Sequence, residues 1–388
     1  MINIQETKNK IAELEKRIND AQRDADRYKA MQLALKLVIN GEYGAMANSH
    51  FVFSNPQIAN AITSMGREII NYMDKVNEYY WYNMWHVDYE LHKALQIEKP
   101  RKLDKEKEPV SIYIDTDSLF VGFQPGMDSC NWNREPLEFV ELVNKHRLSD
   151  YFKEKLDEYA HKYGVENIQD FELERIDESV LFLEKKRYVQ NIVYEDGYYY
   201  NRLEYIYAKG VELVKSSTPL FVREKLTELM KYILDTRHEL SISELNKKVR
   251  EIKQQFIMAD IEDISSTSSV NNYDKWCIDD QVEFKYALGT PFHIKAAIFH
   301  NYLLNQNSKY KKKYNLLTSG QKIKYYYCKD RRNNVFAYSR GLFPKEFAPE
   351  IDVDEQFERT VLNIVNMFIE ALGLPRLNSR LTFNLSLF

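Results

Sequence analysis

Apolar positions in the first part of the chain recur at helical intervals. Between residues 11 and 28 they fall at alternating steps of three and four, the spacing of a coiled-coil stripe, at Ile11, Leu14, Ile18, Ala21, Ala25 and Tyr28. No glycine or proline interrupts the first thirty residues, which continue directly into MQLALKLVING. The pattern predicts one long helix or an antiparallel helix pair.

The helical pattern breaks near Ser54-Asn55-Pro56, and a second helical period runs through residues 58–81. Residues 99–109 are highly charged and predict a loop. A helix is expected near 150–163. Strand-like runs follow across 171–197 and end at a Glu-Asp-Gly turn.

From about residue 208 the pattern changes to long amphipathic helices, such as the stretch PLFVREKLTELMKYIL at 219–234. The segment 259–281 is rich in Ser, Thr and Asp and predicts a loop. No internal repeat is visible in the sequence.

The stretch SIYIDTDSLFV at 111–121 predicts two short strands joined by a tight turn. Turn chemistry explains one aspartate, because Asp and Ser side chains bond nearby backbone amides. Two carboxylates on a largely buried hairpin repel each other unless a cation lies between them. Mg²⁺ takes one or two protein carboxylates and fills its other positions with water and phosphates. This stretch therefore leaves metal binding and simple turn chemistry both open.

The segment LKLVINGEYGAMAN at 35–48 places Lys36, Asn40 and Tyr43 on one helix face, with the small Gly44 beside them. A lysine, an amide and an aromatic ring in line could contact a phosphate and stack on a planar base. The alternative is the end of a helix, where Asn40-Gly41 marks a turn.

Two stretches concentrate positive charge. FLEKKRYV at 182–189 sets three cations inside a strand-like run, which indicates either an exposed sheet edge or contact with nucleic-acid phosphates. The second is either a solvated loop or a surface that follows a nucleic-acid backbone. It contains Lys309, Lys311, Lys312, Lys313, Lys322, Lys324, Lys329, Arg331 and Arg332.

Composition excludes several classes of protein. The 388 residues are 44% hydrophobic and 29% charged, which is typical of a globular chain and not of a disordered one. No apolar run approaches the length of a membrane span. The three cysteines match no zinc spacing, and the polar N-terminus lacks a signal-peptide core, so we expect a reducing cytoplasm. The net charge of −4 leaves room for a basic stripe on one face.

The order of these segments resembles the family B (alpha-type) DNA polymerases, especially their phage branch. KLVINGEYG is similar to the family's fingers-helix motif, YIDTDS to its second palm motif, and KKRY is present intact at 185–188. The resemblance covers nearly the whole chain from about residue 30. Less specific matches are LERIDE (173–178), KGVELVKSSTP (209–219), GTPFHI (289–294) and AYSRGLFPKE (337–346).

The resemblance implies a role for each matching residue. Asp117 would ligate two Mg²⁺ ions, and Asp115 would lie beside the metal site and the primer end, so both are predicted catalytic and metal-site residues. Lys36 would neutralise the incoming triphosphate. The nascent base pair would be lined by Asn40, Tyr43 and Gly44. The predicted primer- and DNA-binding residues are Thr116, Ser118, Lys185, Lys186, Arg187, Tyr188, Lys209 and Gly210, and Glu174 would be a further palm carboxylate.

The sequence departs from the family pattern at two positions. Gly41 stands where the family has Ser, and Ile114 stands where it has the Gly before the first Asp. Neither change removes a metal ligand or a phosphate contact. We therefore expect fidelity or rate to shift rather than the type of reaction.

The family's first palm motif, an Asp followed by Ser-Leu-Tyr-Pro, occurs nowhere in the sequence, and neither does the signature of its 3′–5′ exonuclease. The resemblance thus implies the C-terminal part of a polymerase, either a subunit of a split enzyme or a truncated product. A partner chain would supply the missing Asp and the exonuclease. The apolar stripe at 11–28 would pack on that partner's first fingers helix, or else form a homodimeric coiled coil.

The resemblance also implies a sliding-clamp-binding tail. The predicted anchors in RLTFNLSLF are Leu381, Phe383, Leu385 and Phe388, and the alternative is a last strand packed on the thumb. The expected fold is α+β, with a mixed palm sheet backed by helices, a helical fingers segment and a largely helical thumb. The expected domains are fingers at 1–48, palm at 49–207, thumb at 208–378 and tail at 379–388.

We therefore expect template-directed, two-metal nucleotidyl transfer to a primer 3′-hydroxyl in the cytoplasm of a phage-infected bacterial cell. The expected partners are primer–template DNA, dNTPs, an N-terminal polymerase chain and a sliding clamp. One rival is a non-catalytic module that binds primer–template duplex and the clamp. Another is a coiled-coil structural protein.

Overall fold

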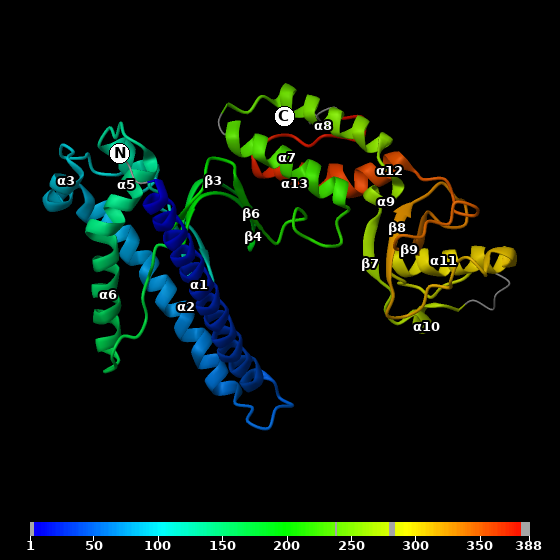
Figure 1. Cartoon of the computed structure of the whole chain (residues 1–388), viewed down its shortest axis with the longest axis horizontal. Coiled ribbons are helices and arrows are strands. Elements are labelled where there is room, and N and C mark those ends of the chain that lie inside the picture. Colours follow the sequence, from blue (N-terminus) through cyan, green and yellow to red (C-terminus); the bar gives the residue numbers. More distant parts are fainter. Residues whose placement is uncertain (1–3, 237–238, 279–283, 382–388) are drawn as a thin grey trace. The chain divides into compact units, whose positions relative to one another are not determined.

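The computed structural model describes residues 4–236, 239–278 and 284–381 (Figure 1). The chain forms two compact units, Met1–Glu172 and Leu173–Phe388. Helices and small antiparallel sheets occur in both, which confirms the expected α+β class. No helix in the described part of the chain is both long and apolar enough to span a membrane.

The N-terminal unit consists of helices around one β-hairpin. Its main core is aromatic and includes Trp81, Trp85 and Phe139, all fully buried. In chain order the elements are α1 (Ile4–Ala47), α2 (Pro56–Tyr79), η1 (Tyr80–Met84), η2 (Trp85–Val87), α3 (Tyr89–Leu95), β1 (Ser111–Asp115), β2 (Ser118–Val121), α4 (Gln124–Ser129), α5 (Pro136–Val143), η3 (Asn144–Leu148) and α6 (Ser149–Lys162).

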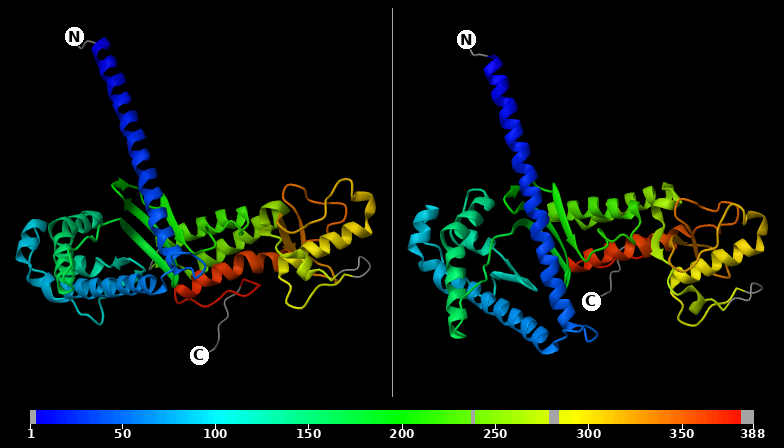
Figure 2. Two further views of the ribbon diagram at one scale, coloured as in Figure 1. Left: turned by 90° about the horizontal axis from the view of Figure 1, so that it is seen from below. Right: turned by 60° about the horizontal axis from the view of Figure 1, so that its bottom comes forward.

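Helix α1 is continuous, so the first of the two alternatives for the N-terminal pattern is confirmed. Figure 2 shows α1 diverging from α2 at the loop that joins them. The stripe residues Ile11, Leu14 and Ile18 are 50%, 46% and 66% exposed. Nothing among the described residues covers this stripe, although its spacing is that of a packed helix.

Helix α2 begins where the sequence pattern predicted a break. The Asn55 side chain accepts a hydrogen bond of 3.1 Å from the backbone N–H of Ile58, and Pro56 occupies the first helical turn. Met73 and Val76 on the buried face join the aromatic core. The Asn77 amide donates to the Ser111 hydroxyl at 2.9 Å, which attaches α2 to the start of β1.

The C-terminal unit contains two antiparallel sheets. A core of aliphatic and aromatic side chains joins α7, α8 and α13 to the first sheet. Its elements are β3 (Arg175–Glu184), β4 (Arg187–Glu195), β5 (Tyr198–Tyr199), β6 (Tyr205–Lys209), α7 (Leu220–Thr236), α8 (Ile242–Met258), α9 (Ile261–Ile264), β7 (Ser266–Ser269), α10 (Tyr273–Trp276), α11 (Phe292–Gln306), η5 (Ser308–Tyr310), β8 (Lys322–Tyr327), β9 (Val335–Ser339), α12 (Val353–Phe357), η6 (Glu358–Leu362) and α13 (Asn363–Ala371).

The second sheet of this unit differs from the sequence prediction. The segment 259–281, predicted as a loop, contains α9, β7 and α10. Strand β7 pairs with β8, so that Ser266 lies opposite Tyr325, and β8 pairs with β9. The loop prediction was wrong because pairing with a strand some sixty residues away, rather than local propensity, fixes this backbone.

All strand pairings among the described residues are antiparallel, and they form three separate sheets rather than one mixed sheet. The boundary between the two compact units, after Glu172, lies inside the segment 49–207 that we expected to be a single palm domain. The predicted domain limits themselves stay predictions.

Candidate active site

The β1–β2 hairpin closes through the shortest possible turn. Asp115 pairs with Ser118, and only Thr116 and Asp117 lie between the strands. The backbone N–H of Asp117 donates to the carbonyl oxygen of Asp115 at 2.7 Å, the hydrogen bond of a γ-turn. The Ser118 hydroxyl donates to the same carbonyl at 3.0 Å. The turn therefore holds both aspartates on one rigid loop.

Thr116 is strained by this turn. Its φ is +63°, a value that β-branched residues rarely adopt. Such a conformation costs about 1–3 kcal/mol and is concentrated at functional sites. The Thr116 hydroxyl donates to Oδ1 of Asp115 at 3.2 Å, which offsets part of the cost of burying that carboxylate.

The two carboxylates have different surroundings. Asp115 is 3% exposed, whereas Asp117 is exposed at the tip of the turn. Mg²⁺ takes one or two carboxylates from a protein in phosphate-containing sites, so the hairpin fits its donor preference. No group of three or more His, Cys, Asp or Glu side chains that could hold a metal occurs within the described ranges. The two carboxylates of the hairpin could therefore supply only part of a ligand set for Mg²⁺.

The four residues predicted to bind the nucleotide lie within the last twelve residues of α1. Lys36, Asn40 and Gly44 are exposed, and Tyr43 is half-buried. Lys36 and Tyr43 are about 10 Å apart along the helix axis. Helix α2 contacts α1 and also β1 and β2, so it links helix α1 to the hairpin that carries the aspartate turn within the N-terminal unit.

The KKRY turn, residues Lys185–Tyr188, joins β3 to β4 in the C-terminal unit. Glu184 pairs with Arg187, so Lys185 and Lys186 alone form the loop, and both are exposed. Lys186 has a φ of +60°. The Tyr188 ring is buried, 3% exposed, at 5.8 Å from the Phe182 ring. The two lysines of the turn therefore lie at the surface, whereas the Tyr188 ring is buried in the C-terminal unit.

Strand β6 runs beside this turn. Lys209 lies opposite Tyr188, and its Nζ is 5.6 Å from the centre of the Tyr188 ring. Gly210 has a φ of +65°, and a Cβ at this position would lie 2.5 Å from the carbonyl oxygen of Lys186. Only glycine allows the chain to approach the turn this closely.

The predicted residues thus form three local groups, on α1, on the β1–β2 turn and on the β3–β4 turn with the end of β6. The first two groups belong to the N-terminal unit and the third to the C-terminal unit. Glu174 is exposed, and its carbonyl oxygen accepts from the backbone N–H of Asp196.

Of the four predicted tail anchors, Leu381 lies within the described residues. Leu381 is 4% exposed and lies in the core of the C-terminal unit. Leu381 lies in a bend and not in the last strand that we gave as the alternative, and the clamp-binding role of the tail stays a prediction. The other predicted anchors, Phe383, Leu385 and Phe388, lie outside the described residues.

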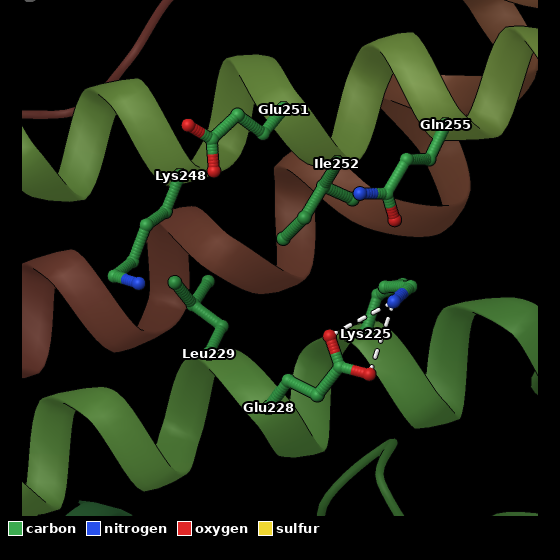
Figure 3. A pocket seen from close by; sticks show the side chains of 7 residues that line it. All are labelled: Lys225, Glu228, Leu229, Lys248, Glu251, Ile252 and Gln255. Atoms are coloured by element: carbon green, nitrogen blue, oxygen red, sulfur yellow. Dashed lines mark hydrogen bonds and ion pairs between the residues drawn. The ribbon is translucent and has the colours of Figure 1, made fainter.

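Surface cavities occur within the described part of the C-terminal unit. Figure 3 shows a small one of about 90 Å³ between α7 and α8, where Lys225 and Glu228 pair at 2.9 Å. A larger one, about 330 Å³, is lined by Glu212, Ser217, Arg359 and Asn363 among others. Neither cavity contains a predicted site residue.

Sequence reasoning missed two acidic residues, Asp177 on strand β3 and Glu212 in the turn that follows β6. Glu212 accepts from Nη2 of Arg187 at 2.8 Å, inside a stretch whose resemblance was noted without a role for the glutamate. Burial raises the pKa of Asp177 to about 6. The Gln190 amide donates to Asp177 Oδ2 at 2.6 Å. Nothing in the sequence pattern distinguishes Asp177 from its exposed acidic neighbours.

The chain is similar to known proteins over most of its length. Residues 4–371 match the profile of DNA polymerase family B. The chain is 26% identical over 322 residues to the DNA-directed DNA polymerase of Escherichia phage RB69, covering 78% of this chain and 33% of the relative. Against the DNA-directed DNA polymerase of Enterobacteria phage T4 the identity is 25% over 299 residues, covering 72% and 30%.

DNA polymerase 1 of Aeropyrum pernix is 24% identical over 280 residues, which cover 70% of this chain and 22% of the relative. The matched region thus spans between about a fifth and a third of the length of these curated relatives.

Proposed function

The chain belongs to DNA polymerase family B, and on this premise we propose that it is the C-terminal subunit of a phage-type replicative polymerase. Its reaction would be template-directed transfer of a nucleotide to a primer 3′-hydroxyl. The observation that carries this proposal is the strained two-residue turn that holds Asp115 and Asp117 together.

Asp117 is the carboxylate best placed to bind Mg²⁺, because it is exposed at the tip of a turn whose backbone is fixed by a hydrogen bond. Bound Mg²⁺ would activate the primer 3′-hydroxyl and stabilise the leaving pyrophosphate. Asp115 is buried and accepts from the Thr116 hydroxyl, so its role would be to orient the turn beside the metal and the primer end.

The exposed ammonium of Lys36 would neutralise the triphosphate, and Asn40, Tyr43 and Gly44 would line the base pair being formed. Lys185 and Lys186 would contact the phosphates of the primer strand. Since Arg187 and the Tyr188 ring are turned into the protein, their contribution would be to hold the KKRY turn in shape.

We further propose that a partner chain supplies the second metal-binding Asp and the 3′–5′ exonuclease. Support comes from the sequence, which contains no Asp followed by Ser-Leu-Tyr-Pro, and from the exposed apolar stripe on α1. A helix with that stripe is stable in water when another helix covers it. The residues beyond Leu381 would bind a sliding clamp, in the cytoplasm of an infected bacterial cell.

The test is primer extension with Mg²⁺ and all four dNTPs, by the chain alone and by the chain co-expressed with a candidate upstream polymerase chain. We expect activity only from the pair. Activity of the chain alone would mean that another carboxylate, such as Glu174, completes the metal site. Inactivity of both, with duplex binding retained, would favour a non-catalytic module that binds primer–template duplex.

A further inference from the structure

The KKRY turn places two like charges next to each other on a two-residue loop. Lys185 and Lys186 are both exposed, and Lys186 is in the left-handed region at a φ of +60°. For a residue with a side chain, this backbone conformation has an unfavourable free energy. A turn of this kind keeps one shape only if neighbouring residues hold it.

Each nitrogen of the Arg187 guanidinium donates to an oxygen of the protein. Its Nη2 donates to Glu212 Oε2 at 2.8 Å and its Nη1 to Glu184 Oε2 at 3.1 Å. Its Nε donates to the carbonyl oxygen of Gly210 at 3.2 Å. Because each guanidinium nitrogen already donates to an oxygen of the C-terminal unit, Arg187 is poorly placed to bind a phosphate as well.

Glu212 and Glu184 differ in how they are built into the structure. The Glu212 side chain is 20% exposed, and its other oxygen accepts from Lys215 Nζ at 2.7 Å. The Glu184 side chain is 69% exposed. A half-buried carboxylate that accepts hydrogen bonds from two cations restrains the position of an arginine far better than a solvated carboxylate does.

The residues just before Glu212 touch the turn at two further points. Gly210 fits against the Lys186 carbonyl oxygen, where a Cβ would lie 2.5 Å away, and Lys209 Nζ lies over the Tyr188 ring. The segment 209–212 therefore contacts the KKRY turn through its backbone, a cation and a carboxylate.

We propose that Glu212 is a positioning residue for the primer strand. It fixes Arg187 against the segment 209–212 and thereby holds Lys185 and Lys186 in the arrangement that contacts the primer phosphates. This inference rests on the proposed function, since it requires that the KKRY turn binds primer–template duplex.

The positioning role can be tested, because an effect of charge alone would change DNA binding in the opposite direction. A carboxylate near a DNA-binding turn repels phosphates, so its neutralisation should tighten DNA binding. If Glu212 instead positions the turn, Glu212→Gln should weaken binding. The matched control is Glu184→Gln, which removes the same charge from a partner of the same arginine.

The experiment measures the dissociation constant of the full-length chain for a fluorescent primer–template duplex by anisotropy, at one fixed salt concentration. We expect Glu212→Gln to raise this constant roughly tenfold, as is typical of coupled neighbouring side chains. Glu184→Gln should leave it unchanged or lower it. In a double-mutant cycle, adding Glu212→Gln to the Arg187→Gln variant should change the dissociation constant little further, because both changes break the same contact.

Melting temperatures of all variants are measured alongside. Equal or tighter binding by Glu212→Gln would overturn the positioning role and leave the proposed function intact. A Glu212→Gln chain that is unfolded at the assay temperature would assign Glu212 to stability and also overturn it. Failure of the unmodified chain to bind the duplex would remove the proposed DNA contact of the turn, and the positioning role with it.

Discussion

The backbone N–H of Asp117 donates to the carbonyl oxygen of Asp115 at 2.7 Å, across a single intervening residue. Although this hydrogen bond holds the two residues on one turn, their side chains have opposite surroundings, because Asp115 is buried and Asp117 is exposed. Neighbouring residues of the same chemical type therefore have different tasks in the proposed reaction.

The first prediction concerns Asp117→Asn in the assembled polymerase. The amide keeps the shape of the side chain but loses the charge that binds Mg²⁺. Because a catalytic metal contributes several kcal/mol, primer extension should slow by a factor on the order of 10³. Single-turnover extension measures this, with Glu106→Gln on an exposed loop as control. Retention of full activity by Asp117→Asn would contradict the catalytic proposal.

The second prediction concerns Gly210→Ala. A Cβ at this position would meet the Lys186 carbonyl oxygen at 2.5 Å while φ is +65°, so the variant suffers both a clash and backbone strain. Gly197→Ala is the matched control, because its φ is +88° but no atom lies within 4 Å of the added Cβ.

We expect Gly197→Ala to lower the free energy of unfolding by about 1 kcal/mol through strain alone, and Gly210→Ala to lower it by roughly 2–4 kcal/mol. Denaturant titration measures both values. If both variants lost the same free energy of unfolding, the close approach of Gly210 to the Lys186 carbonyl oxygen would contribute nothing to the cost of the substitution.

The third prediction concerns Gly41→Ser, which restores the hydroxyl of the family motif. Gly41 is exposed on α1, and an added Cβ would have no atom within 4 Å. The chain should fold normally and gain a few tenths of a kcal/mol, since Ser is a better helix former than Gly. Gly66→Ser on α2, also free of contacts, controls for helix propensity.

The added hydroxyl lies near the proposed base-pair pocket, so Gly41→Ser should change the ratio of correct to incorrect incorporation by less than about tenfold. Steady-state incorporation of single nucleotides measures that ratio. An unchanged ratio would place position 41 outside the pocket.

The fourth prediction concerns Asp177 and pH. Burial raises its pKa to about 6 in the folded chain, above the value of about 3.9 expected when unfolded. Between these values the folded state binds more protons than the unfolded state. The contribution of Asp177 to stability therefore falls as pH rises through this window, by an amount on the order of 3 kcal/mol.

Asp177→Asn removes the buried charge and should stabilise the chain at pH 7 by up to that amount, with the gain disappearing near pH 4. Denaturant titration at several pH values measures it, and Asp274→Asn on the exposed part of α10 is the control for the loss of one carboxylate from the surface. A gain that is the same at every pH would mean that ionisation of Asp177 is not its cause.

Much of the fold could be predicted from the sequence because it is encoded locally. The spacing of Ile11, Leu14 and Ile18 predicts a helix whatever surrounds it, and α1 is one continuous helix. Asn55-Pro56 starts α2 through a cap that involves residues three apart. The hairpin at 111–121 needs only two short apolar runs and a turn.

Other features depend on contacts that no local pattern contains. The strand Ser266–Ser269 exists because it pairs with β8, about sixty residues later, so its Ser- and Thr-rich sequence predicted a loop. The lysines at 322 and 324 lie on that same β8 strand and not on a solvated loop. Lys324 is half-buried there, and its ammonium donates to the Glu262 carbonyl oxygen.

For the candidate site, the sequence by itself determined which residue types stand in which order: the lysine of α1, the two aspartates of the turn, and the KKRY run. The tertiary structure alone decided what each can do. It buries Asp115 and exposes Asp117, and it turns Arg187 from the expected phosphate contact toward Glu212. Burial and pairing depend on which distant segments pack together, and that is a property of the whole folded chain.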